Sequence, residues 1–198
     1  MLALWLVLCA PIAVETQPAT ISWAIDAADS NRSVSLYREA ARTWAASLDD
    51  ERVIVFSGLL SGTIPGTGKR VVPCCDGRDL TQSIEDAQQK REHTWAKMLA
   101  LFPRSDWYVS TEDDVWWNVT GLQTLLAPLS TSKPRLVGMG PGHSVYGPYV
   151  IVNRPLLELF ANASLLSACR DEIIRQNPWT TYTCVSLPMD DCLLAATL

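Results

Sequence analysis

Three consecutive acidic residues, Glu112, Asp113 and Asp114, are the residues whose type and spacing best suit chemistry in this sequence. They directly follow residues 107–111, an aromatic and β-branched run that predicts a strand. Adjacent carboxylates repel one another, and a divalent cation with oxygen ligands compensates that repulsion. We therefore expect a metal site here that can bridge to a diphosphate and neutralise the charge on a departing nucleotide.

A second acidic pair, Asp190 and Asp191, follows the Leu-Pro-Met run at 187–189 and precedes a predicted helix. A carboxylate in this position suits a general base that removes the proton from an attacking hydroxyl group. Both acidic groups have a simpler interpretation as well. They can be solvated turns, or charges that the dipole of a following helix favours.

The elements that must position these acids alternate along the chain. Short apolar runs predict buried strands, and apolar residues at helical spacing predict amphipathic helices between them. This alternation indicates an α/β domain with a mostly parallel central sheet flanked by helices. The acids at 112–114 then lie at the carboxyl end of a strand, where such sheets bind ligands. We expect strands at 21–25, 53–56, 107–111, 136–139 and 149–152, and helices at 36–48, 81–101, 119–129 and 154–166.

The loop at 61–68 is rich in glycine, proline and threonine and is followed by Lys69. It does not keep the spacing of a phosphate-binding P-loop, and Pro65 stands where such a loop needs a backbone donor. We interpret it as a surface loop instead.

The overall composition sets the number of domains and excludes one class of partner. With 198 residues, of which 48% are hydrophobic and 19% charged, the chain can bury one sizeable core. A net charge of -5 argues against nucleic acid, because binding to a phosphate backbone needs a basic face. We therefore expect a single domain and no nucleic-acid partner.

Several features favour the secretory pathway. Residues 1–13 are apolar and too short for a comfortable membrane span, so we expect a signal peptide or short signal anchor at 1–16. Asn31, Asn118 and Asn162 each begin an acceptor sequence for N-glycosylation. The six cysteines fit the same oxidising compartment.

The spacing of two cysteines suggests a disulfide. Cys169 and Cys184 flank a segment that a disulfide could close. The neighbours Cys74 and Cys75 are not expected to pair with each other, because of the usual distance between bridged residues.

Taken together, these segments resemble the Fringe-like β-1,3-glycosyltransferases, which share the GT-A nucleotide-sugar-binding fold with the core 1 galactosyltransferases. Residues 107–119 resemble the metal-binding strand, acidic triplet and following aromatic stretch of that family. The other matching segments are Thr43-Trp44, the helix around Lys97, the strand at 146–154 and the element at 187–192.

The resemblance implies a role for each matching residue. Asp114 would hold Mn²⁺ with help from Glu112, while Glu112 and Asp113 would contact the UDP-sugar donor. Because they lie next to these acids, Trp116 and Trp117 are the tryptophans we expect to pack in the donor site, with Trp116 contacting the donor. Asp191, or else Asp190, would be the catalytic base. The implied reaction is an inverting transfer of a hexose or N-acetylhexosamine to a hydroxyl group of a glycan or glycoprotein in the ER or Golgi lumen.

The chain also departs from the family pattern. Glu112 stands where aspartate is usual, Pro148 removes a backbone donor, and the chain ends at Leu198, before the histidine that completes the family's metal site. We therefore expect a domain at 20–198 that is short at its C-terminus. Two alternatives stay open: a catalytically inactive glycan-binding or structural relative, and a hydrolase that uses the two acidic clusters as acid and base.

Overall fold

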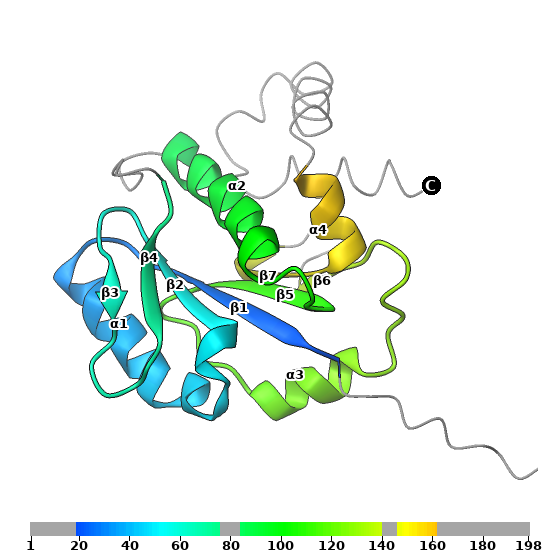
Figure 1. Ribbon diagram of the computed structural model, residues 1–198, viewed down its shortest axis with the longest axis horizontal. Helices are drawn as coiled ribbons and strands as arrows, with labels where there is room; N and C mark the ends of the chain where they lie inside the picture. Colours follow the sequence, from blue (N-terminus) through cyan, green and yellow to red (C-terminus); the bar gives the residue numbers. More distant parts are fainter. Residues whose placement is uncertain (1–18, 76–83, 140–145, 162–198) are drawn as a thin grey trace, which may run out of the picture.

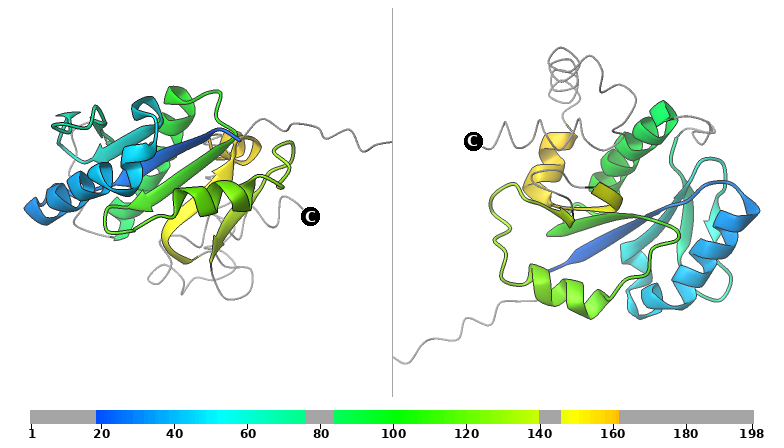
Figure 2. Two further views of the ribbon diagram at one scale, coloured as in Figure 1. Left: turned by 90° about the horizontal axis from the view of Figure 1, so that it is seen from below. Right: turned by 180° about the vertical axis from the view of Figure 1, so that it is seen from behind.

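The computed structural model describes residues 19–75, 84–139 and 146–161, which form three layers with a β-sheet in the middle (Figure 1). Helices α1 (Asn31–Arg42) and α3 (Val119–Leu126) cover one face of the sheet. Helices α2 (Ile84–Leu101) and α4 (Arg154–Phe160) cover the other face (Figure 2). The α/β class expected from the sequence is confirmed.

Within the described residues, seven strands form one sheet in the order β3-β4-β2-β1-β5-β7-β6. The four adjacent strands β4, β2, β1 and β5 run parallel. The strands outside them, β3 on one side and β7 and β6 on the other, are antiparallel to their neighbours. The expected parallel arrangement therefore holds for the centre of the sheet, whereas both margins are antiparallel. The strands are β1 (Ile21–Asp26), β2 (Val53–Ser57), β3 (Gly62–Thr63), β4 (Arg70–Pro73), β5 (Trp107–Glu112), β6 (Leu136–Met139) and β7 (Tyr146–Asn153).

The central strands are buried on both faces, which explains why they read as continuous apolar runs. One face of β1 contributes Trp23 and Ile25 to the core under α1 and α3. The other face contributes Ala24 to a second core that contains Trp95 and Met98 of α2. Both of these α2 residues are buried.

Local sequence signals fix where the helices begin and end. The Ser30 side chain caps α1 by accepting a hydrogen bond of 3.1 Å from the Ser33 amide. Asn153 caps α4 in the same way, with Pro155 in the first turn. The helix expected to reach residue 48 instead ends at Arg42, and a 3₁₀ turn, Trp44–Ser47, continues the chain.

The loop at 61–68 contains the short strand β3 and three glycines with positive φ, Gly62, Gly66 and Gly68. The Lys69 side chain that follows is buried rather than free for a ligand. Its ammonium group lies 2.6 Å from Asp50 Oδ1 and donates to the Leu48 carbonyl at 3.3 Å. Lys69 therefore connects the hairpin of β3 and β4 to the turn before β2. This contact agrees with the interpretation of residues 61–68 as a surface loop rather than a P-loop.

Among the helices of the described residues, none combines the length and apolar character needed to cross a bilayer. The expected leader at 1–16 lies outside the described residues.

Candidate active site at the carboxyl edge of the sheet

The four parallel strands end at one edge of the sheet, which we call the carboxyl edge. From β1 the chain moves to β2 and β4 on one side and then returns to β5 on the other side. Such a reversal opens a crevice between the ends of two neighbouring strands, and ligands of open α/β sheets bind there. In this chain the reversal lies between the ends of β1 and β5, where Asp26 is paired with Glu112, and we use the word crevice for this position.

The acidic turn, which we define as residues 112–114, therefore stands at the reversal point of the sheet. Glu112 is the last residue of β5 and is exposed, as is Asp114, whereas Asp113 is partly buried between them. The Asp113 carboxylate accepts a hydrogen bond from the hydroxyl group of Ser33 in the first turn of α1. The turn thus presents two carboxylates to solvent and anchors the third against a helix.

The position of Asp113 is electrostatically favourable. The backbone amides at the start of α1 carry the positive end of the helix dipole, which stabilises a nearby carboxylate. Ser33 is 4% exposed, so its hydroxyl group bonds Asp113 with little competition from water. This contact fixes the acidic turn relative to α1.

Asp26, at the end of β1, is a further acid that sequence reasoning did not single out. Its carboxylate accepts hydrogen bonds from Ser110 in β5 at 2.6 Å and from Thr94 in α2 at 3.0 Å. The available signal was an acid at the end of the first predicted strand. Asp26 links the two strands that border the crevice to the helix behind them.

Asp29 likewise connects two elements, the loops that follow β1 and β2. It accepts hydrogen bonds from the Ser57 hydroxyl group and, at 2.8 Å, from the Leu59 amide. The Ser57 hydroxyl oxygen in turn accepts from the Leu60 amide at 3.1 Å. Side chains therefore hold the backbone on this side of the crevice.

A cavity of about 280 Å³ lies beside these loops, between α1 and the β2–β3 connection. Tyr37 in its wall is buried, and this burial raises the pKa of its phenol, with Arg38 acting in the opposite direction. Tyr37 is therefore a neutral hydrogen-bonding group at physiological pH. The lining residues are Val34, Tyr37, Arg38, Leu60, Ser61, Gly62, Thr63, Ile64, Pro65 and Val71.

The two tryptophans after the acidic turn differ sharply in environment. Trp117 donates to the Thr111 hydroxyl group at 2.9 Å and packs edge-on against Trp23 and Tyr149, with ring centroids 5.3 and 4.9 Å away. Trp116 is 67% exposed. Trp117 is thus a structural anchor of this segment, and Trp116 stands on its solvent side.

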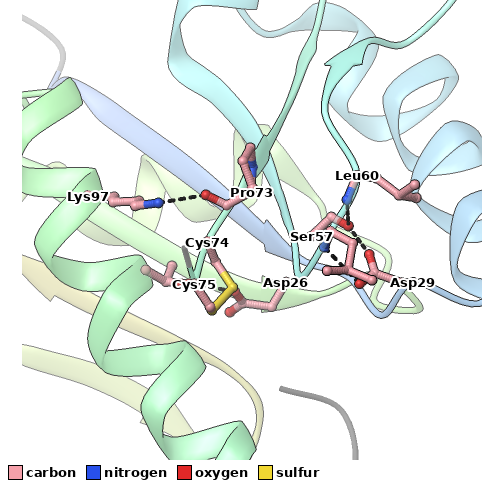
Figure 3. Close-up of a disulfide and its surroundings, with 10 residues drawn as sticks. Asp26, Asp29, Ser57, Leu60, Pro73, Cys74, Cys75 and Lys97 are labelled. Carbon is pink, nitrogen blue, oxygen red and sulfur yellow. Dashed lines mark hydrogen bonds between the residues drawn. A yellow bond between two sulfur atoms is a disulfide. The ribbon is translucent and has the colours of Figure 1, made fainter. Parts of the chain in front are cut away.

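Cys74 and Cys75, at the end of β4, form a disulfide, so the expectation that these neighbours would not pair was wrong (Figure 3). The usual distance range describes cysteines brought together by folding, whereas these two Cα atoms, 3.7 Å apart, are held by one peptide unit. Both residues are fully buried. The candidate pair Cys169 and Cys184 lies outside the described residues.

The disulfide lies beside the loops of the crevice. The Cys74 amide donates to the Ser57 carbonyl at 2.7 Å, and the Lys97 ammonium group donates to the Pro73 carbonyl at 2.6 Å. In Figure 3, Asp26 lies next to the cysteines and Asp29 next to Ser57. The end of β4 is therefore connected both to α2 and to the end of β2.

Not every predicted site residue can be placed. Asp190 and Asp191 lie outside the described residues. Within the described residues, no group of three or more histidine, cysteine, aspartate or glutamate side chains converges to hold a cation. Glu112 and Asp114 are the exposed acids of the turn, and a cation held there would need further ligands from a bound substrate or from other residues.

Comparison of the sequence with protein-family models and with curated proteins finds no match.

Proposed function

We propose that this chain is a metal-dependent glycosyltransferase that uses a UDP-sugar donor, with the diphosphate bound at the acidic turn. The proposal rests on the position of two exposed acidic residues, Glu112 and Asp114, which lie at the reversal point of the sheet. The resemblance to the Fringe-like family supplies the reaction class. The GT-A fold in particular belongs to this proposal.

The chemistry of these donors suits Mn²⁺ or another hard divalent cation. Such ions take oxygen ligands and are commonly held by one or two carboxylates together with phosphate oxygens of the substrate. Asp114, with Glu112, would hold the ion, which when bound would neutralise charge on the diphosphate leaving group. An incomplete set of protein ligands is compatible with this arrangement, because the donor substrate brings its own oxygens.

Other residues of the chain would position the acidic turn and transfer the proton. Ser33 holds Asp113, which keeps the acidic turn at the start of α1. Asp26 ties the two strands that border the crevice. Asp191, or Asp190, would take the proton from the acceptor hydroxyl group as its oxygen attacks the anomeric carbon of the sugar and the bond to the UDP oxygen breaks. The acceptor is a hydroxyl group of a glycan or glycoprotein, and attack opposite the leaving group inverts the anomeric centre.

Calorimetric titration of UDP with and without Mn²⁺ tests the donor site. We expect binding that needs the metal and that falls at least about tenfold in Asp114→Ala, because loss of one charged ligand costs more than about 1.4 kcal/mol. Glu158→Gln is the matched control, since Glu158 is an exposed acid on α4, which begins at the opposite end of β5. Equal UDP binding in Asp114→Ala and Glu158→Gln would refute the assignment.

Turnover separates the enzyme from an inactive relative. If UDP binds with metal but UDP-sugars are consumed neither by water nor by glycan acceptors, the chain is a nucleotide-sugar-binding relative without transferase activity. Loss of turnover with retained UDP binding in Asp191→Asn would assign the base.

A further inference from the structure

From the last residue of β5 onward the chain alternates in exposure over nine residues, 112–120. Every second residue is exposed and those between are partly buried, along a stretch that leads from the last residue of β5 through a turn to the first two residues of α3. The exposed residues are Glu112, Asp114, Trp116, Asn118 and Thr120.

The cause of this alternation is the inward anchor at Trp117. Its indole donates to Thr111 and packs against Trp23 and Tyr149, so its neighbours in the chain turn the other way. Asn118 is fixed as well, because its side chain caps α3. Trp116, Asn118 and Thr120 are each exposed, on a segment that is held at several points.

Asn118, Val119 and Thr120 form an acceptor sequence for N-glycosylation, and an exposed aromatic ring stands two residues before the asparagine. We infer that Asn118 carries an N-linked glycan and that its first N-acetylglucosamine packs against the ring of Trp116, which then does not contact the UDP-sugar donor as the family resemblance implies. The apolar face of a pyranose ring covers an indole well, which removes exposed aromatic surface from water. The inference does not rest on the proposed transferase activity and requires only that the chain enter the ER lumen.

The chemical step is the ordinary one for such sites. The Asn118 amide nitrogen attacks the anomeric carbon of an oligosaccharide carried on a lipid diphosphate, and a new C–N bond forms. The bond from that carbon to the diphosphate oxygen breaks, and the lipid diphosphate leaves with the electron pair. The proton lost from the amide passes to a base of the transferring enzyme, so charge and atoms balance.

The capping role of Asn118 is compatible with the modification. Its carbonyl oxygen Oδ1 accepts the hydrogen bond from the Gly121 amide at 2.9 Å. The glycan attaches to the other atom of the amide group, Nδ2, and leaves that oxygen free to accept. The modified residue can therefore still begin α3.

The other acceptor sequence in the described residues has a different environment. Asn31 is exposed, but its partner Ser33 is buried and donates its hydroxyl group to Asp113. In the sequence at Asn118, by contrast, both the asparagine and the threonine are exposed. In the folded chain the acceptor sequence at Asn118 is therefore accessible, whereas the serine of the acceptor sequence at Asn31 is buried.

The full chain expressed in cultured mammalian cells tests the site. Peptide mass spectrometry after treatment with a glycosidase that converts glycosylated asparagine to aspartate should find this conversion at position 118. Thr120→Ala should abolish it, and Thr120→Ser should retain it, while both variants keep Asn118 and its cap. An unmodified Asn118, whether the chain is secreted or stays in the cytosol, would overturn the inference.

Thermal unfolding tests the contact with Trp116. The glycosylated chain should melt at a higher temperature than Thr120→Ala, and Trp116→Ala should reduce this difference. Asn31→Gln is the control and should leave the difference unchanged. If the difference is the same with and without Trp116, the packing of the sugar on the ring is refuted even where the glycan is present.

Discussion

At the scale of single residues, the contact between Ser33 and Asp113 connects α1 to the acidic turn. A sequence reading can find the acids, because three of them in a row after an apolar run are conspicuous. It cannot find their partner, since Ser33 lies 80 residues earlier in the chain. The roles of the three acids therefore separate only when the fold is known.

Ser33→Ala should lower the free energy of unfolding by about 1–3 kcal/mol, because Asp113 loses a hydrogen bond in a partly buried position. The urea midpoint measures this change. Ser35→Ala is the matched control on the same helix, where the exposed hydroxyl group bonds only the Asn31 carbonyl, and it should change stability by about 0.5 kcal/mol or less. Equal effects of the two substitutions would show that the contact contributes nothing.

Tyr108 gives the chain a pH dependence at the alkaline end. Burial raises the pKa of its phenol above 10.0, with Arg154 acting in the opposite direction, and the hydroxyl group donates to the Phe102 carbonyl at 2.7 Å. The folded state therefore favours the neutral phenol. The resulting stability is fully present below pH 10.0 and is lost as the pH rises through the pKa of the folded state.

Urea unfolding at a series of alkaline pH values should show this loss in the unsubstituted chain and less of it in Tyr108→Phe. The variant should also be about 1 kcal/mol less stable at neutral pH, because the hydrogen bond to Phe102 is absent. Burial also raises the pKa of the Tyr37 phenol. Any loss of stability at alkaline pH that remains in Tyr108→Phe should therefore become smaller when Tyr37→Phe is added. Identical pH profiles for Tyr108→Phe and the unsubstituted chain would contradict the prediction.

At the scale of elements, the disulfide at the end of β4 is a local constraint beside the crevice. The bond joins neighbouring residues and therefore closes the shortest possible loop. It reduces the entropy of the unfolded chain only slightly, which stabilises the fold by about 1 kcal/mol. We therefore expect it to shape the connection to α2 rather than to hold the fold together.

A thiol reductant should accordingly lower the free energy of unfolding by about 1 kcal/mol without unfolding the chain. The double substitution Cys74→Ala and Cys75→Ala is the control, because it removes this disulfide and leaves the other cysteines. The part of the reductant effect that disappears in the double variant belongs to the Cys74–Cys75 bond. Complete unfolding by reductant of the unsubstituted chain, but not of the double variant, would contradict this prediction.

The elements themselves were largely predictable. Each strand expected within the described residues is present, because buried strands are short and continuously apolar. Their ends were less accurate: β7 begins at Tyr146 rather than at residue 149, and the helix expected to reach residue 48 ends at Arg42. Thr43 leaves helical geometry there, with φ -113° and ψ -104°, although the apolar spacing continues past it.

At the scale of the whole molecule, the direction of the strands at the margins was not predictable. The parallel centre follows from alternating strands and helices, but β6 and β7 are separated by a short connection with no helical pattern and pair antiparallel. Their placement next to β5 depends on long-range packing, such as the contact of Tyr149 with Trp117.

The pairing of β1 with β5 has a consequence for the order in which the molecule assembles. Ile21 pairs with Trp107, and the adjacent Thr20–Asp106 contact spans 86 residues, whereas the pairing of β1 with β2 joins residues close along the chain. Closing a long loop costs entropy before the contact is gained, so distant pairings form slowly. Because the crevice lies between these two strands, we expect it to be among the last features to form as the chain folds. During synthesis, β1 must wait for β5 to emerge from the ribosome before Asp26 and the acidic turn can meet.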